Sequence, residues 1–213
     1  MLFVMSLFVA FAVISSLVDW VKARRRSPQA VQVQVLLTDG AKVKAQLQKL
    51  AQSHDPDRPG GLLTLLRESA LLLLRHKGDW AYGTLERRRA GNLSGAASVV
   101  GGWAARARAA FETQTTSQYQ DGNAHKGFVG TRKNQGRPGG TYLAVTLAAS
   151  TVDTTNFKVA RGTPESLETA LLALAGVEEG QLGRLEVVWS PDAEGEFLNE
   201  DEAIRRYPAL TRL

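Results

Sequence analysis

The feature that most constrains this chain is its uncharged opening stretch, because no Asp, Glu, Lys or Arg occurs before Asp19. A helix over residues 1–20, rising about 1.5 Å per residue, is long enough to cross a hydrocarbon core of about 30 Å. A helix is also the only single segment that satisfies its own backbone groups in lipid. We therefore predict a transmembrane anchor over residues 1–20.

A basic cluster follows this stretch at once. The positive-inside rule then predicts a single-pass cell-membrane protein with its N-terminus outside and its soluble domain on the cytoplasmic side. Residues 21–30 form the expected basic juxtamembrane linker. A cleaved signal peptide is the alternative, although it calls for positive charge before the apolar core. The membrane-interface residues predicted here are Trp20, Lys22, Arg24, Arg25 and Arg26.

Charge is distributed unevenly along the rest of the chain. Residues 75–140 carry 11 Lys/Arg and 4 Asp/Glu, whereas residues 141–213 carry 6 and 12. Such asymmetry is typical of a nucleic-acid or membrane surface, or of two halves that pair with each other. The chain has no cysteine, which excludes disulfides, thiolate metal sites and a cysteine nucleophile.

Hydrophobic periodicity predicts one soluble α+β domain over residues 31–213, with a small mixed sheet of about three strands packed with several helices. We expect strands over 31–37, 142–148 and 184–189, the first with one buried face and one polar face. If the last two strands are parallel neighbours, their crossover should be right-handed. The expected helices cover residues 41–52, 62–75, 93–118, 163–175 and 199–206.

Two further features complete this outline. The leucine-rich helix over 62–75 is too short and too interrupted by Arg67 and Glu68 for a second membrane span, so it is predicted to lie in the core. Glycines and basic residues over 121–140 predict a flexible surface loop. Thr163 before Pro164, and Asn199 with Glu202, are typical helix caps.

Four motifs lie near residue 80 and at the C-terminal end. They are a Leu-rich helix ending in Arg-His, a Trp-x-Tyr-Gly, a strand ending in Trp-Ser-Pro, and a closing Tyr-Pro-x-Leu. In this order they resemble the motifs of the membrane-anchored family called domain of unknown function 1517. The resemblance implies no established activity, and a plant relative is linked to acclimation to fluctuating light. The signature residues are Arg75, His76, Trp80, Tyr82, Gly83, Trp189, Pro191, Tyr207 and Pro208.

Residues that could carry chemistry are scattered. The three histidines, His54, His76 and His125, lack metal-ligand spacing, and His76 at a helix end is expected to cap the last carbonyls. The glycine pair at 122 and 127 has the spacing of a phosphate loop without its Lys and Ser/Thr. Carboxylates crowd residues 192–202 without EF-hand spacing, which favours a solvated turn over a cation site.

From these patterns we predict no catalytic residue, no metal site and no cofactor. The favoured function is a noncatalytic, membrane-tethered interaction or regulatory module that acts on a protein partner. One alternative is an enzyme whose site is built from unremarkable Asp, Arg and Tyr residues. The other is a membrane-bound nucleic-acid binder that uses Arg87, Arg88 and Arg89, a weaker hypothesis because few aromatic residues accompany the cations.

Overall fold

The computed structural model describes residues 27–53, 55, 58–110, 140–152 and 162–213. They form a five-stranded sheet in the order β4-β3-β1-β2-β5, in which every neighbouring pair is antiparallel. The strands are β1 (Gln29–Leu37), β2 (Trp80–Arg89), β3 (Leu143–Thr151), β4 (Leu182–Ser190) and β5 (Thr211–Arg212).

Strand β1 lies at the centre of the sheet, and every one of its residues is buried. Its valines face the main hydrophobic core together with Leu37, because side chains alternate between the two faces of a strand. The opposite face carries Gln32 and Gln34, with Ala30 and Leu36 at its two ends. The face that looks polar in the sequence is therefore covered as well.

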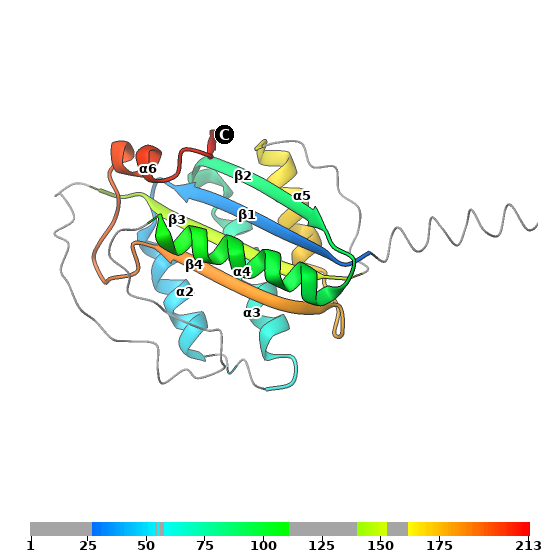
Figure 1. The fold of residues 1–213 in the computed structure, drawn as a ribbon. Helices are drawn as coiled ribbons and strands as arrows, with labels where there is room; N and C mark the ends of the chain where they lie inside the picture. The colour runs from blue at the N-terminus through cyan, green and yellow to red at the C-terminus, as the bar shows by residue number, and fades with distance from the viewer. Residues whose placement is uncertain (1–26, 54, 56–57, 111–139, 153–161) are drawn as a thin grey trace, which may run out of the picture.

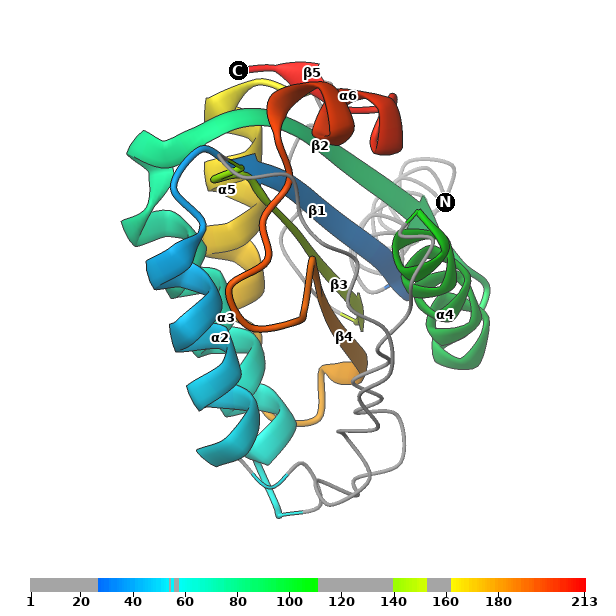
Figure 2. The ribbon, with the colours of Figure 1, turned by 90° about the vertical axis from the view of Figure 1, so that its left-hand side faces the viewer.

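The helices form a layer on each side of the sheet (Figures 1 and 2). Helices α2 (Ala41–Ser53), α3 (Gly61–Arg75) and α5 (Pro164–Ala175) cover the face with the main core. Helix α4 (Leu93–Ala109) crosses the other face, and α6 (Glu200–Arg206) lies on that side near the C-terminus. A short 3₁₀ turn, η1 (Lys77–Asp79), joins α3 to β2.

The helix ends follow the sequence signals closely. Thr163 caps α5 and exchanges hydrogen bonds with Ser166, while Pro164 occupies the first turn. Asn199 and Glu202 form the expected capping box of α6. Helix α3 buries Leu65, Leu66, Leu72 and Leu73 in the main core, which confirms that it is a core helix.

The predicted mixed sheet of about three strands is wrong. Strands β3 and β4 are antiparallel neighbours. Helix α5 begins near Gly83 and Thr211, at the opposite end of the sheet from Thr151, where β3 ends. The helix therefore runs towards the Thr151 end, and β4 starts there with Leu182 beside Thr151. Strands β2 and β5 were not predicted. In β2 the glycine at position 83 and the run Arg87–Arg88–Arg89 obscure the alternation that marks a strand, and β5 has only 2 residues.

The predicted fold also contained a transmembrane helix, and this needs correction. No helix in the described part of the chain is both long enough and apolar enough to cross a membrane. Residues 1–20 lie outside the described residues, as do Trp20, Lys22, Arg24, Arg25 and Arg26. The loop predicted over 121–140 lies outside them too, apart from Gly140, as do His54 and His125.

Candidate functional site

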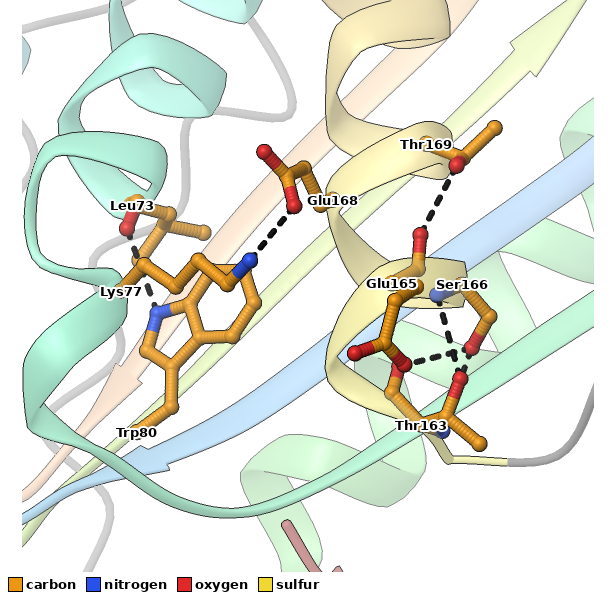
Figure 3. Close-up of polar contacts among 8 residues, drawn as sticks. All are labelled: Leu73, Lys77, Trp80, Thr163, Glu165, Ser166, Glu168 and Thr169. Atoms are coloured by element: carbon orange, nitrogen blue, oxygen red, sulfur yellow. Dashed lines mark hydrogen bonds and ion pairs between the residues drawn. The ribbon is translucent and has the colours of Figure 1, made fainter.

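The first group of signature residues lies where α3 ends and β2 begins (Figure 3). The indole N–H of Trp80 donates to the carbonyl of Leu73 at 3.2 Å, which fixes the start of β2 against the end of α3. Nδ1 of His76 lies 3.0 Å from a carboxylate oxygen of Asp79, and the backbone N–H of His76 caps α3. The imidazole therefore pairs with η1, whereas the sequence predicted that it would cap the helix carbonyls. Arg75 is exposed, 3.9 Å from Glu68.

Tyr82 and Gly83 of β2 contact the C-terminal part of the chain. The hydroxyl of Tyr82 donates to a carboxylate oxygen of Glu200 at 3.2 Å. The carbonyl of Gly83 accepts a hydrogen bond from Oγ1 of Thr211 at 3.0 Å. A Cβ at position 83 would lie 2.6 Å from Cδ1 of Leu167, so this glycine is required by close packing of β2 against α5.

The closing signature residues divide between the two faces of the sheet. Trp189 packs in the main core, whereas Tyr207 packs on the opposite face with Leu36 and Ala144. Burial raises the pKa of Tyr207, and a hydrogen bond with Ser190 partly offsets this. Pro191 is buried directly after β4, and Pro208 is exposed beside a cavity. Most of the signature residues thus make contacts within the fold, at three separate places, and they do not converge on one site.

The covered polar face of β1 carries the cavity just mentioned, with a volume of about 230 Å³. Strand β1 supplies its floor through two glutamines, α4 supplies one wall, and the segment after α6 supplies the other. The cavity is lined by Gln32, Gln34, Glu86, Trp103, Arg106, Ala107, Ala110, Arg206, Tyr207, Pro208 and Ala209.

Two arginines attach α4 to this polar face. Arg108 pairs at 2.7 Å with Glu186 of β4, which is only 4% exposed, and Arg184 binds the other oxygen of the same carboxylate. Arg106 reaches the opposite side and lies 3.7 Å from Glu86 of β2. Because Glu86, Gln32 and Glu186 lie in one row across the sheet, α4 is held at both ends of that row.

The acidic stretch that follows β4 packs around the buried ammonium group of Lys44. Lys44 of α2 is 3% exposed, and its ammonium donates to the carbonyls of Ala193 and Glu196, the latter at 2.9 Å. It also lies 4.9 Å from the ring centroid of Phe197. Burial lowers the pKa of Lys44 to about 8, against the opposing effect of Asp192, Glu196 and Glu194. The described residues contain no cluster of His, Asp and Glu suited to a metal ion.

The predicted basic run lies at the end of β2. Arg88 and Arg89 are exposed, whereas Arg87 is partly buried and donates through Nε to the side chain of Gln29. Burial lowers the pKa of Arg87, and the neighbouring charge of Arg89 adds to this. One of the three cations is therefore bound to the sheet, and two face outward.

The family described as "Protein of unknown function (DUF1517)" matches residues 28–213, which include the whole described domain. The chain belongs to the DUF1517 family. The resemblance drawn from the signature residues is thereby confirmed. In this DUF1517 domain, most of those residues make the internal contacts described above.

Two named relatives have similar sequences. Protein FLAP1 homolog A from Synechocystis sp. is 30% identical over 185 residues, covering 84% of this chain and 55% of that protein. FLUCTUATING-LIGHT-ACCLIMATION protein 1, chloroplastic, from Arabidopsis thaliana is 25% identical over 216 residues, covering 97% of this chain and 54% of that protein. The DUF1517 chain thus spans about half the length of these relatives. No solved structure matches it.

The most polar buried positions of the DUF1517 domain escaped the sequence analysis. Gln32 and Gln34 were assigned to a solvent-facing side of their strand, since a half-buried strand shows the same alternation. Lys44 is one of several lysines in α2, and nothing in its spacing marks it as buried. Glu186 sits between apolar residues in β4, and this was the one available signal of a buried charge.

Proposed function

We propose that this DUF1517 domain is a noncatalytic interaction module of a regulatory system, related to the acclimation to fluctuating light for which its relatives are named. The family has no described activity, so the proposal rests on one surface of the molecule. The anchor predicted over residues 1–20 forms no part of this proposal.

The surface lies along the seam between α3 and α5. These helices pack side by side in opposite directions, because Arg67 near the middle of α3 donates through Nε to the carbonyl of Ala175 at the end of α5, whereas Lys77 beyond the end of α3 pairs with Glu168 near the start of α5. At the other end of the seam, Lys77 pairs with Glu168 (Figure 3). In this register Leu71 of α3 and Leu172 of α5 lie at similar heights along the seam, between these two contacts.

Both of these leucines are exposed, Leu71 by 36% and Leu172 by 54%. Charged side chains frame them: Arg67 at one end, the Lys77–Glu168 pair at the other, and Glu68 with Arg75 on α3. We call this surface the α3–α5 face. An apolar centre with a polar rim is the usual anatomy of a protein interface, so this face suits a partner protein that buries an apolar side chain between two helices.

The α3–α5 face is also firmly supported. The inward sides of α3 and α5 are packed in the main core through Leu66, Leu73, Leu167 and Leu171, all of them fully buried. A rigid face loses little conformational freedom when a partner binds, which favours affinity. This combination of exposed leucines and a rigid support is the observation that carries the proposal.

Crosslinking and capture from cells that express the tagged full chain would test it. We expect the wild type to retain a stoichiometric protein partner, and Leu172→Arg to lower its recovery by about tenfold, because a buried apolar contact is replaced by a charge. Ile204→Arg is the matched control, since Ile204 is 45% exposed on α6 at the other side of the sheet. Failure to capture any stoichiometric partner, or equal recovery with both variants, would refute the proposal.

A further inference from the structure

Strand β4 forms one edge of the sheet, and no described strand lies beyond it (Figure 2). At the other side of the sheet, β2 is partly covered by β5, which pairs with Tyr82 and Gly83. Proteins often protect an edge strand with lysine, proline or a bulge, because its unpaired backbone groups attract further strands. Strand β4 contains no lysine and no proline, and its one irregularity lies at its start, beside Thr151. Its edge is therefore regular over most of its length.

The register of the sheet shows which backbone groups of β4 face outward. The N–H of Ala90 donates to the carbonyl of Pro28, directly before β1, so even-numbered residues of β1 face β2 and odd-numbered ones face β3. Following the pairing through β3, the even-numbered residues of β4 bond to β3. Three residues of β4 therefore direct their backbone N–H and C=O groups away from the sheet: Leu185, Val187 and Trp189.

These outward groups have no partner in the described structure. No hydrogen bond among the described residues reaches the backbone N–H or C=O of Leu185, Val187 or Trp189. Their side chains pack on the main core, so they point across the sheet and do not cover its edge. Backbone groups in folded proteins are paired as a rule, and a row of unpaired ones is the surface to which an added strand binds.

A second copy of the chain offers the same row in the opposite direction. If two β4 strands run antiparallel about a twofold axis at Val187, Leu185 faces Trp189 of the second copy, and Val187 faces its own counterpart. Each facing pair then forms two hydrogen bonds. A shift to one side sets Glu186 against its counterpart, and like charges directly opposite destabilise a sheet. A shift to the other side brings Pro191, which has no N–H, into the row.

The charges of β4 also permit this contact. Glu186 is the one acidic residue of the strand, and its two carboxylate oxygens are bound by Arg108 and Arg184 of the same chain. A second copy therefore meets a neutralised cluster and no bare carboxylate. In the register centred on Val187, Glu186 stands opposite the second copy's Val188, and Arg184 stands opposite its Ser190.

We propose that two copies of this chain pair antiparallel through β4, with Val187 at the twofold axis, so that one sheet continues across the dimer. An interface of this kind is isologous, since the same strand serves both partners. The pairing uses neither Leu71 nor Leu172, so it is independent of the α3–α5 face. Leu172→Arg should therefore leave it unchanged.

Disulfide crosslinking tests the pairing, because the chain has no cysteine of its own. In Val187→Cys the two introduced thiols face each other, with Cα atoms about 5.5 Å apart, which a disulfide can span. Lysates of cells that express the full chain with two different tags are oxidised with copper phenanthroline. We expect a product of twice the chain mass that carries both tags. Ile204→Cys, exposed on α6, is the matched control and should give only background. Equal yields at both positions, or no product at position 187, overturn the proposal.

A proline at the same position tests the hydrogen bonds. Val187→Pro removes an N–H that faces away from β3, so the ladder between β3 and β4 is kept, and proline is tolerated at such edge positions. Capture of one tagged copy by the other should fall about tenfold, because two central hydrogen bonds of the dimer are lost. Val187→Thr keeps the N–H and the branched shape, and it should be captured as the wild type is. Equal capture of Val187→Pro and the wild type overturns the proposal, and the cysteine test decides it should the proline variant fail to fold.

Discussion

Raising the pH should increase the free energy of unfolding of this domain through Lys44. This is the opposite of what is expected for a lysine whose pKa is raised by an ion pair, because such a lysine loses its stabilising charge as the pH rises. Burial lowers the pKa of Lys44 from 10.5 to about 8. Between these two values the unfolded chain holds the proton and the folded chain has released it. The free energy of unfolding therefore rises with pH in this window, and it is unaffected by Lys44 below pH 8, where both states are protonated.

The size of the effect follows from the width of the window. Each pH unit between the two pKa values contributes about 1.4 kcal/mol per proton, so the rise between pH 8 and 9.5 should be at most about 2 kcal/mol. This range stays below the titration of Tyr142 and Tyr207, whose pKa values are raised from 10.0 mainly by burial. Protons on these tyrosines therefore contribute little below pH 9.5.

Urea unfolding followed by circular dichroism at several pH values from 7 to 9.5 measures this slope. In Lys44→Met the rise should disappear, because no group titrates at that position. Lys42→Met is the matched control, since Lys42 is exposed on the same helix and should keep the wild-type slope. Parallel pH profiles for the wild type and Lys44→Met would show that the ammonium is not desolvated as the structure indicates.

Three further substitutions, each measured by chemical denaturation, test two contacts between the helices and the sheet and one helix cap. Glu186→Ala should cost about 3 kcal/mol, because it leaves two partly buried arginines unpaired beneath α4, and a loss below 1 kcal/mol would contradict this. Gly83→Ala should lower the free energy of unfolding by about 1–3 kcal/mol, because the added Cβ would clash with Leu167 of α5. A stabilised variant would show that the strand can move away from the helix. Asn92→Ala should lower the free energy of unfolding by about 1 kcal/mol, because its side chain caps α4 by accepting from the N–H of Gly95. Gln46→Ala, at an exposed position of α2, is the control and should change the free energy of unfolding little.

The elements that the sequence predicted well are those whose signals are local. The helices over 61–75 and 164–175 show a clear apolar period, and Thr163 and Asn199 mark helix starts through contacts within four residues. Asn92 caps α4 in the same local way, although it was not among the predicted caps. Contacts of this kind form between residues that are close in the sequence, so a single sequence is enough to predict them.

What the sequence could not predict depends on contacts between distant segments. Strand β2 is stabilised by pairing with β1 and by close packing at Gly83, whereas its own residues include three arginines that favour no strand. The direction of β4 depends on where α5 begins. The burial of Gln32 depends on α4 crossing a face that alternation alone assigns to solvent, and the burial of Lys44 depends on a loop almost 150 residues further along the chain.

The proposed function is that this DUF1517 domain holds a protein partner on the α3–α5 face. A photo-crosslinking amino acid placed at position 172 in the full chain, and at position 204 in a parallel sample, measures this directly in cells. We expect one discrete crosslinked protein at position 172 and none above background at position 204. Crosslinks of equal yield at both positions, or none at position 172, would contradict it.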